Sequence, residues 1–218
     1  LTHERPFAVR VRFAPSPTGF LHIGGLRTAL YNFLFARHNG GKFLLRIEDT
    51  DRTRMVPGAV EKLIDVLKWC SLQCDEDIVI QSQRLDIYKK YAEELLEKKF
   101  AYKCFCSPAR LDEMRKSQIE KKQPPKYDGT CKGLSDDETE KLAKEKPYTV
   151  RMVIPQEEIK FNDIIRGEIK FHGCLIDDQV ILKSDGYPTY HMANVVDDHL
   201  MGITHVIRGE EWLSSTPK

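Results

Sequence analysis

The sequence lacks several features that define broad classes of protein. It has no run of about 18 apolar residues, the length that a membrane-spanning helix needs, so no membrane span is expected. Its 34 basic and 33 acidic residues give a formal net charge of +1, so any RNA contact must come from a local basic face. Six cysteines in 218 residues do not suggest a disulfide scaffold, and we expect reduced thiols. No internal repeat or low-complexity segment is present.

The N-terminal part predicts a strand, a helix and a second strand. Residues 7–13 alternate apolar with basic side chains, as a strand does, and Phe7 is the first of the apolar ones. The helix that follows carries apolar residues at three- and four-residue steps, which predicts one buried face: Leu26, Ala29, Leu30, Phe33 and Leu34. Gly40-Gly41 ends the helix, and residues 43–47 predict the next strand. Strands joined by a helix in this way are parallel, with a right-handed crossover.

The loop between the first strand and the helix has the character of an anion site. Two prolines stiffen it, and its glycines let the backbone approach a ligand. His22 stands at the mouth of the helix, followed by the amides of Ile23, Gly24 and Gly25, which have no partner within the helix. These amides and the helix dipole favour a phosphate. The glycine spacing matches neither the dinucleotide-binding nor the Walker pattern.

The remaining chain breaks the alternation of strands and helices. We expect a helix opened by Pro57, an irregular stretch from Cys70 to Ser82, and a helix beginning near Tyr88. Caps at Ser107-Pro108 and Ser135 each predict a helix, and short strands are expected at 100–105, 150–154, 159–171 and 178–183. Residues 110–132 are rich in lysine (Lys116, Lys121, Lys122, Lys126, Lys132). This block fits a phosphate-contacting face, or else a solvated surface.

Several segments, in order along the chain, resemble the glutamyl-tRNA synthetases, a family of class I aminoacyl-tRNA synthetases. Residues 14–19 with His22-Ile23-Gly24-Gly25 are similar to the first class I signature, in which the glutamyl and glutaminyl branch often ends in Gly. The resemblance continues through 46–51, 183–191, 194–199 and 208–212, and so covers nearly the whole chain. It implies an α/β fold, with a Rossmann-like parallel-sheet catalytic domain interrupted by an α+β insertion that binds the tRNA acceptor stem. The domains expected are 1–87, 88–182 and 183–218, the last being the truncated second half of the catalytic domain.

The resemblance implies ligation of L-glutamate to tRNA(Glu) through a glutamyl-adenylate, with ATP as substrate and Mg²⁺ carried on its phosphates. In that reaction a glutamate carboxylate attacks the α-phosphorus and pyrophosphate leaves, which requires positioning and charge stabilisation. His22 with Thr18, Gly24 and Gly25 would hold the phosphates. Glu211 and Trp212, together with His22 and Gly24, match positions that bind ATP.

Glutamate carries two carboxylates and one ammonium, so its pocket needs cations and at least one anion. Arginine can hold a carboxylate through two parallel hydrogen bonds, and Arg12 and Arg208 are the predicted cations. Glu48 is expected to bind the ammonium, and Ser16, Tyr190 and Asn194 match positions that hydrogen-bond the amino acid. Taken singly, Arg12 with Glu48 would be a structural ion pair and Tyr190 a core aromatic. The four aspartates near these segments (Asp49, Asp51, Asp197, Asp198) are interpreted as structural or capping residues.

One cysteine cluster has metal-ligand character. Cys104 and Cys106 are followed by Tyr127 and Cys131, although Cys-x-Cys is tighter than the usual zinc spacing. Some glutamyl-tRNA synthetases, and a shorter tRNA-modifying paralogue, bind zinc through a similar set whose fourth ligand is a His or a Tyr. Here Gly133 stands in the place of the His and Tyr127 in the place of the Tyr. Two interpretations stay open: a zinc site, or three buried or half-buried thiols.

The resemblance also implies parts that these 218 residues do not contain. The second class I signature, a Lys-x-Ser-Lys loop, is absent from the sequence, and so is an anticodon-binding domain. We therefore interpret the chain as a catalytic portion, inactive or weak alone, of a monomeric enzyme. Two other hypotheses are the paralogue that transfers glutamate to a queuosine base of tRNA(Asp), and a non-catalytic RNA-binding module. The expected location is the mitochondrial matrix, with a bacterial cytoplasm as the alternative.

Overall fold

The protein is described here by a computed structural model that covers residues 8–218. Residues 1–7, which include Phe7 of the expected first strand and the start of the expected first domain, lie outside the described residues. The described chain forms two compact units. The first consists of residues 8–85 with Ala193–Ser214, and the second of Asp86–Met192 with Ser215–Lys218.

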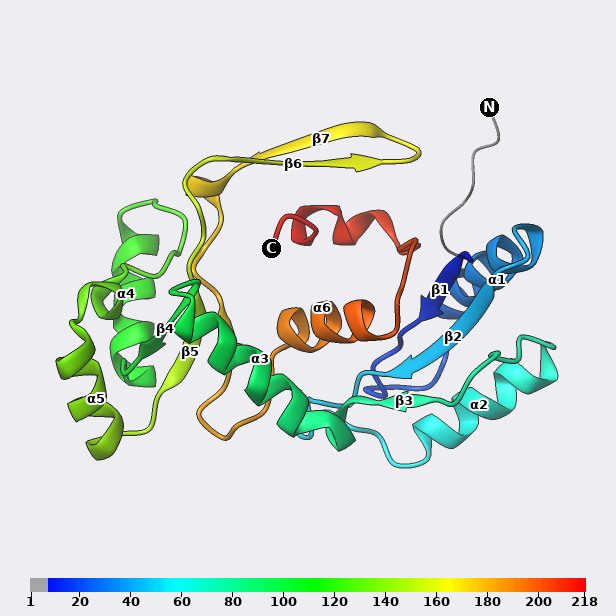
Figure 1. Ribbon diagram of the computed structural model, residues 1–218, viewed down its shortest axis with the longest axis horizontal. Coiled ribbons are helices and arrows are strands. Elements are labelled where there is room, and N and C mark those ends of the chain that lie inside the picture. The colour runs from blue at the N-terminus through cyan, green and yellow to red at the C-terminus, as the bar shows by residue number, and fades with distance from the viewer. Residues whose placement is uncertain (1–7) are drawn as a thin grey trace. The chain divides into compact units, whose positions relative to one another are not determined.

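The first unit is built on a three-stranded parallel sheet of order β1-β2-β3, as Figure 1 shows. Its elements are β1 (Arg10–Phe13), α1 (Ile23–His38), β2 (Lys42–Ile47), α2 (Ala59–Trp69) and β3 (Val79–Ile80). β1 pairs with β2 from Arg10↔Lys42 to Phe13↔Leu45, and β2 with β3 at Arg46↔Val79 and Ile47↔Ile80. The predicted α/β class and the parallel strand–helix–strand unit are therefore confirmed.

The central strand β2 is buried from Phe43 to Ile47, as expected for a strand covered on both faces. Phe33 of α1 packs edge-on against Phe43, with ring centroids 5.7 Å apart. The predicted apolar face of α1 is wrong in part. Leu30 and Leu34 are 41% and 52% exposed, whereas the buried residues of this helix are Ala29, Asn32 and Ala36.

Two boundaries in the first unit differ from expectation. α2 begins at Ala59 rather than at Pro57, because Gly58 takes a left-handed conformation (φ +76°) and caps the helix. The stretch 70–82, expected to be irregular, contains β3 and the start of a 3₁₀ helix at Gln81–Arg84. β3 is only two residues long, so its apolar pair gave no periodic signal.

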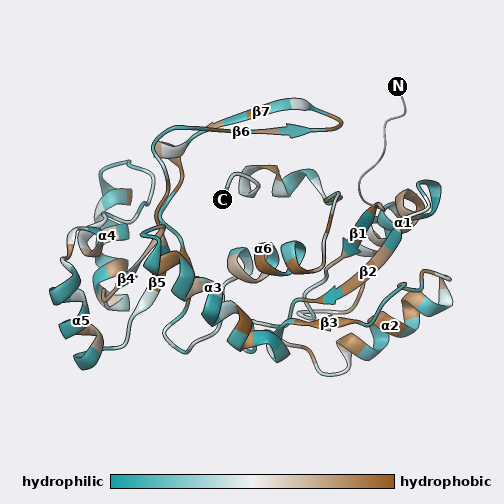
Figure 2. Ribbon diagram, in the orientation of Figure 1, coloured by the Kyte–Doolittle hydropathy of each residue, from teal (hydrophilic) through white to brown (hydrophobic). Residues whose placement is uncertain are grey.

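The second unit holds an antiparallel sheet of order β4-β5-β8 and a separate hairpin, β6–β7. Its elements are α3 (Leu85–Glu97), β4 (Ala101–Cys104), α4 (Pro108–Glu120), α5 (Asp136–Glu145), β5 (Thr149–Met152), β6 (Glu158–Asp163), β7 (Gly167–His172) and β8 (Val180–Leu182). Both predicted caps are confirmed: Ser107 accepts from the Arg110 amide, and Ser135 and Glu138 form a capping box. Figure 2 shows α5 as mostly hydrophilic, in agreement with its lack of buried residues.

The helix α6 (Tyr190–Leu200) leads the chain from the second unit back into the first. After it, Thr204 is tied to β1: its amide donates to the Arg10 carbonyl at 2.9 Å, and its hydroxyl accepts from the Arg10 amide at 2.9 Å. Asn32 of α1 donates to the Ile207 carbonyl at 3.2 Å. These bonds fix residues 204–207, just before Arg208, against β1 and α1. Within the described residues, every helix is too short or too polar to cross a membrane.

Candidate functional site

The loop after β1 delivers His22 to the N-terminus of α1. His22 is the N-cap residue, and its Nδ1 accepts from the Gly24 amide at 3.1 Å. One of the three amides expected to face an anion is therefore already bonded to the imidazole. A Cβ at Gly24 would lie 2.8 Å from His22 Cε1, so this position needs glycine for the ring to lie over the first turn.

Two backbone hydrogen bonds hold the loop beside the end of β2. The Glu48 amide donates to the Pro15 carbonyl at 3.0 Å, and the Val56 amide to the Pro17 carbonyl at 2.9 Å. Ser16, which lies between the two bonded prolines, is exposed, and so are Thr18 and His22, which follow them. These side chains are thus accessible to a ligand at the carboxyl end of the parallel strands, where open α/β sheets bind their ligands.

A chain of buried ion pairs lies at the same edge of the sheet. Asp198 of α6 accepts through one oxygen, Oδ1, from Arg12 Nε at 2.9 Å and from Arg46 Nη1 at 2.5 Å. Arg46 also donates to Glu48 Oε1, from Nη2 at 3.0 Å and from Nε at 3.3 Å. The structure therefore brings Arg12 and Glu48 into one network, but joins them through Arg46 and Asp198 rather than as a direct pair.

Burial shapes the titration of this network. Burial raises the pKa of the Glu48 carboxyl, and attraction to Arg46 and Arg12 only partly opposes it. Burial lowers the pKa of Arg46, but the two carboxylates outweigh that effect and the pKa is raised. The Arg46 side chain is fully buried (0% exposed), and the two carboxylates offset the cost of burying its charge.

Three of the aspartates interpreted as structural are bound by donors outside this network. Asp197 is bound by Gln81 and Arg84, at 3.0 and 2.9 Å, and Asp49 by Ser82. Asp51 is bound by Thr53 and Arg54, which lower its pKa to about 2. The importance of Arg46 was missed from the sequence, although a lone arginine within an apolar strand was a usable signal.

The remaining predicted substrate residues lie on α6 or in the segment that follows it. Asn194 is buried on this helix. Arg208 lies over the Trp212 ring, 5.9 Å from its centroid, so a residue predicted for glutamate and one predicted for ATP are neighbours. Gly209 leaves room for the Glu211 carboxylate, which would lie 2.3 Å from a Cβ there. Tyr190 belongs to the second unit, where its ring packs against His191 at 5.2 Å.

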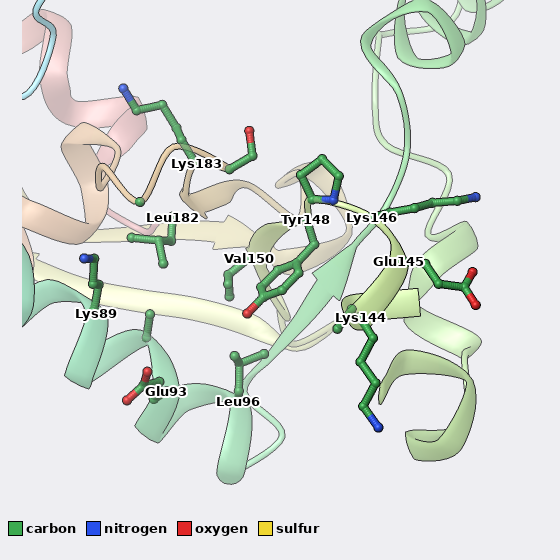
Figure 3. A pocket seen from close by; sticks show the side chains of 15 residues that line it. Lys89, Glu93, Leu96, Lys144, Glu145, Lys146, Tyr148, Val150, Leu182 and Lys183 are labelled. Carbon is green, nitrogen blue, oxygen red and sulfur yellow. The ribbon is translucent and has the colours of Figure 1, made fainter. Parts of the chain in front are cut away.

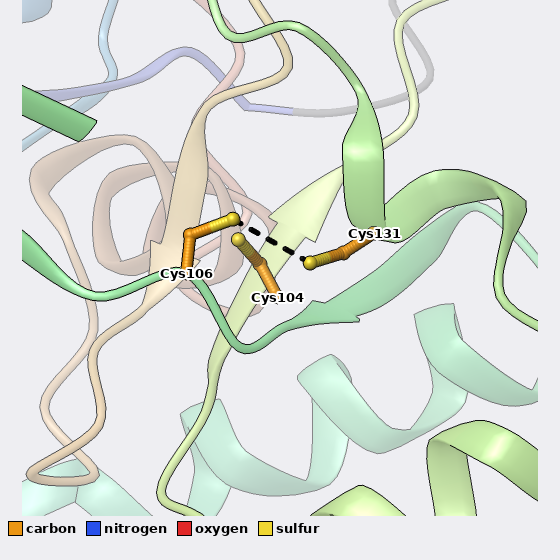
Figure 4. A group of neighbouring side chains, drawn as sticks. All are labelled: Cys104, Cys106 and Cys131. Atoms are coloured by element: carbon orange, nitrogen blue, oxygen red, sulfur yellow. Dashed lines mark hydrogen bonds between the residues drawn. The ribbon is translucent and has the colours of Figure 1, made fainter. Parts of the chain in front are cut away.

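The structure brings together the four side chains of the proposed metal cluster. Among residues 8–218, Cys104, Cys106 and Cys131 form the one group of three or more potential ligands, with sulfur atoms within 4.8 Å of one another (Figure 4). The Tyr127 oxygen is 3.5 Å from Cys104 Sγ and 3.3 Å from Cys106 Sγ, and Cys106 lies 3.6 Å from Cys131. Ligands of a tetrahedral zinc lie roughly 3.8 Å apart, so these four residues fit the ion.

Two arginines place positive charge beside this cluster. Arg110 Nη1 is 3.4 Å from Cys106 Sγ, and the Arg151 guanidinium lies 4.0 Å from the centroid of the Tyr127 ring. Burial raises the pKa of Cys104, but hydrogen bonding to Tyr127 and to the Cys106 backbone, with Arg151 nearby, brings it down to about 7. Burial raises the pKa of Cys106 to about 11. Arg151 thus favours the thiolate of Cys104, whereas burial also raises the pKa of Tyr127, so Cys106 and Tyr127 would have to release their protons on binding zinc.

The second unit also contains a groove of about 570 Å³ between α3, the end of α5 and the turn after β8 (Figure 3). Four lysines line this groove: Lys89, Lys144, Lys146 and Lys183. Glu93 and Glu145 also line it and offset part of the positive charge. The lysine block predicted from the sequence lies elsewhere in this unit. Lys126 donates to the Cys174 carbonyl and Lys132 pairs with Asp178, while Lys116, Lys121 and Lys122 are exposed.

A parallel sheet whose first strand runs into a glycine-bearing turn and a capped helix is the arrangement typical of nucleotide-binding α/β proteins. The family described as tRNA synthetases class I (E and Q), catalytic domain, matches residues 8–218. The chain belongs to this family. It is 56% identical to a glutamate–tRNA ligase of Finegoldia magna, covering 96% of this chain and 47% of the relative. It is 53% identical to the mitochondrial glutamate–tRNA ligase of Saccharomyces cerevisiae, covering 96% and 41%.

A solved structure agrees with these relatives. It is described as a glutamate tRNA ligase from Elizabethkingia meningosepticum in complex with its amino acid, and it matches with a TM-score of 0.91 and 45% identity. That match covers 97% of this chain and 45% of the solved chain. The chain therefore spans about half the length of the proteins it resembles.

Proposed function

We propose that this chain forms the glutamate- and ATP-binding part of a glutamate–tRNA ligase. The observation that carries the proposal is the network at the end of β1 and β2. There Arg12 and Glu48, a cation and an anion, belong to one network, and the Glu48 amide also anchors the loop that carries His22. A dicarboxylic amino acid needs charges of both signs, and a nucleotide phosphate needs a helix N-terminus. The ligases from F. magna and yeast favour this function over the paralogue and the non-catalytic module.

The proposed reaction divides these residues by role. Arg12 and Arg208 hold the carboxylates of glutamate, Glu48 holds its ammonium, and Ser16, Tyr190 and Asn194 complete the polar contacts. His22, Thr18, Gly24 and Gly25 orient the ATP phosphates, with Glu211 and Trp212 beside the adenosine. One glutamate carboxylate attacks the α-phosphorus, pyrophosphate leaves, and the glutamyl group passes to the terminal ribose of tRNA. Magnesium enters with ATP.

Isothermal titration of the intact protein with a non-hydrolysable glutamyl-adenylate analogue tests this proposal. We expect binding by the wild type and a loss of at least tenfold in Arg208→Ala, because a bidentate arginine–carboxylate contact is removed. The control is Arg54→Ala, since Arg54 is 72% exposed and paired only with Asp51 in the described part of the chain. Absence of heat with the wild type, or equal binding by the two variants, argues for a non-catalytic module.

We further propose that the second unit contacts the acceptor stem of tRNA(Glu). The support for this contact is a local group of exposed lysines on α4 and just after it, because the net charge of the whole chain is only +1. Lys116, Lys121 and Lys122 are the candidates, since Lys126 and Lys132 already have protein partners. Replacing these three lysines together by Gln should raise the KM for tRNA and flatten its salt dependence, with the KM for glutamate unchanged.

The cysteine cluster is proposed to hold one structural zinc ion through Cys104, Cys106, Cys131 and Tyr127. Plasma mass spectrometry of gently purified protein should find one zinc per chain, and near none in Cys131→Ser. The matched control is Cys174→Ser, because Cys174 is exposed and lies outside the cluster. Zinc absent from the wild type would leave three reduced thiols as the interpretation. A monomeric state and a mitochondrial location stay predictions.

A further inference from the structure

Asp198 has a position in the network that the proposed roles do not explain. Its side chain is 18% exposed and lies between two arginines, Arg12 (5% exposed) and Arg46 (0% exposed). Both arginines donate to the same oxygen, Oδ1. Asp198 is on α6, more than 150 residues away in sequence from β1 and β2, so the contact is made by the fold alone.

We propose that Asp198 is the positioning residue of the glutamate pocket, and this inference rests on the proposed function. It binds Arg12 through Nε, and within the described residues the two Nη groups of Arg12 have no protein partner. The outer edge of that guanidinium is thereby kept for a substrate carboxylate. Through Arg46, the same aspartate also fixes the Glu48 carboxylate, which accepts from Arg46 Nη2 and Nε.

Asp198 thus sets the spacing between Arg12, which is proposed to bind a carboxylate of glutamate, and Glu48, which is proposed to bind its ammonium group. Without Asp198, Arg12 is free to pair with Glu48 directly. Each charge would then neutralise the other, and neither group would be available to bind glutamate. Arg46 would keep only one charged partner, Glu48, which leaves part of its positive charge uncompensated. The ATP-binding turn at His22 makes no contact with Asp198 in the described residues, so its function should persist.

The test is aminoacylation kinetics of the intact protein with Asp198→Asn. We expect the KM for glutamate to rise at least tenfold while the KM for ATP stays within twofold. The matched control is Asp197→Asn, the neighbouring buried carboxylate, which binds Gln81 and Arg84 instead. It should lower the melting temperature without changing the ratio of the two KM values.

A double variant separates positioning from general damage. Because Asp198 acts partly through Arg12, Asp198→Asn should lower kcat/KM for glutamate by a smaller factor in an Arg12→Ala background than in the wild type, the remaining loss coming from Arg46 and Glu48. The inference is overturned if Arg12→Ala and Asp198→Asn lower kcat/KM for glutamate by independent factors that multiply in the double variant. It is also overturned if Asp198→Asn raises the KM values for glutamate and ATP equally, or if Asp197→Asn gives the same pattern. Should Asp198→Asn not fold, Arg12→Lys tests the same geometry. A single ammonium lacks the fork needed to bind Asp198 and substrate together, so an unchanged KM for glutamate in Arg12→Lys refutes it.

Different results would overturn the proposed function and the inference about Asp198. A wild type that does not charge tRNA with glutamate overturns the proposed function and the inference with it. A wild type that charges normally, with Asp198→Asn unchanged, overturns the inference alone.

Discussion

Arg46 is a charge held inside an apolar strand, and its surroundings explain why that is tolerated. Residues 43–47 read as a continuous hydrophobic strand apart from this one side chain, which is 0% exposed. Burying a guanidinium costs several kcal/mol unless charged partners accept all its donors. Glu48 is two residues away and was visible in the sequence, but Asp198 is 152 residues away. Propensity and spacing do not report such a pairing, so the network had to come from the structure.

At His22 we predict that a methyl group added to Gly24, in the first turn of α1, disturbs the proposed ATP site. In Gly24→Ala the new Cβ would approach His22 Cε1 to 2.8 Å, so the ring must rotate and its bond to the Gly24 amide is lost. A displacement of about 1 Å near reacting groups lowers rates by up to 10²-fold. We expect kcat/KM for ATP to fall at least tenfold in aminoacylation kinetics.

The control for this change is in the same loop. Gly19→Ala adds a Cβ with nothing within 4 Å, so its kinetics should match the wild type within about twofold. Equal losses in the two variants would show that loop flexibility, rather than the position of His22, governs the site.

The exposed ion pairs predict a pH effect on stability. Glu76 accepts from Arg10 and Lys42, each at 2.7 Å, and these bonds lower its pKa to about 2. A lowered carboxyl pKa adds stability above the unfolded value of about 4.5, and that stability is lost as pH falls towards 2. Glu76→Gln should therefore cost about 0.5–1 kcal/mol at pH 7 by urea unfolding, a range typical of exposed pairs.

The difference in free energy of unfolding between wild type and Glu76→Gln should decrease steadily as the pH is lowered from 4.5 to 3. A difference that is constant over this range would mean that the carboxylate charge is not what stabilises the contact.

At the scale of elements, caps and strands were predicted more successfully than helix faces. Ser107-Pro108 and the Ser135–Glu138 box are local signals, and both mark the helix starts found in the structure. The face of α1 depends on its partners instead. Asn32 is fully buried because it donates to the carbonyls of Thr28 and Ile207, while apolar Leu30 and Leu34 face outward. The 3.6-residue period alone does not choose between adjacent stripes.

The base of the β6–β7 hairpin is closed by Gly173. Its amide donates to the Glu157 carbonyl at 2.9 Å, and a Cβ there would lie 1.8 Å from the Pro155 carbonyl oxygen. Since that neighbour is backbone, it must shift to make room. We predict that Gly173→Ala destabilises the protein by about 2–3 kcal/mol in chemical denaturation, a size typical of buried steric conflict.

Gly133→Ala serves as the comparison, because a Cβ there meets nothing within 4 Å and φ is not left-handed. It should change the free energy of unfolding by less than about 0.5 kcal/mol. If Gly173→Ala is equally mild, the hairpin base is looser than its backbone contacts indicate.

At the scale of the whole molecule, the sequence predicted the parallel α/β part well because its motifs are local and ordered. The division into two units also crosses α6, whose first residues fall in the second unit, and no break in composition marks that point. The cysteine cluster joins the end of β4 to the 3₁₀ helix Thr130–Gly133, more than 20 residues apart.

Zinc removal should therefore affect one unit more than the other. We predict that a chelator lowers one thermal transition of the intact protein and leaves the transition of the parallel-sheet unit in place, because the ligands all belong to the second unit. Calorimetry with and without chelator measures this, and Cys131→Ser should mimic the chelated protein. A uniform shift of all transitions would contradict a local structural role for the metal.

Selection of glutamate by charge in the proposed pocket can be measured by competitive charging of tRNA(Glu). The intact protein is assayed with labelled glutamate and glutamine, as wild type and as Arg12→Ala. We expect the wild type to prefer glutamate strongly, and the variant to lose at least tenfold in kcat/KM for glutamate. Equal charging with glutamine, or an unchanged preference in Arg12→Ala, would contradict selection by charge.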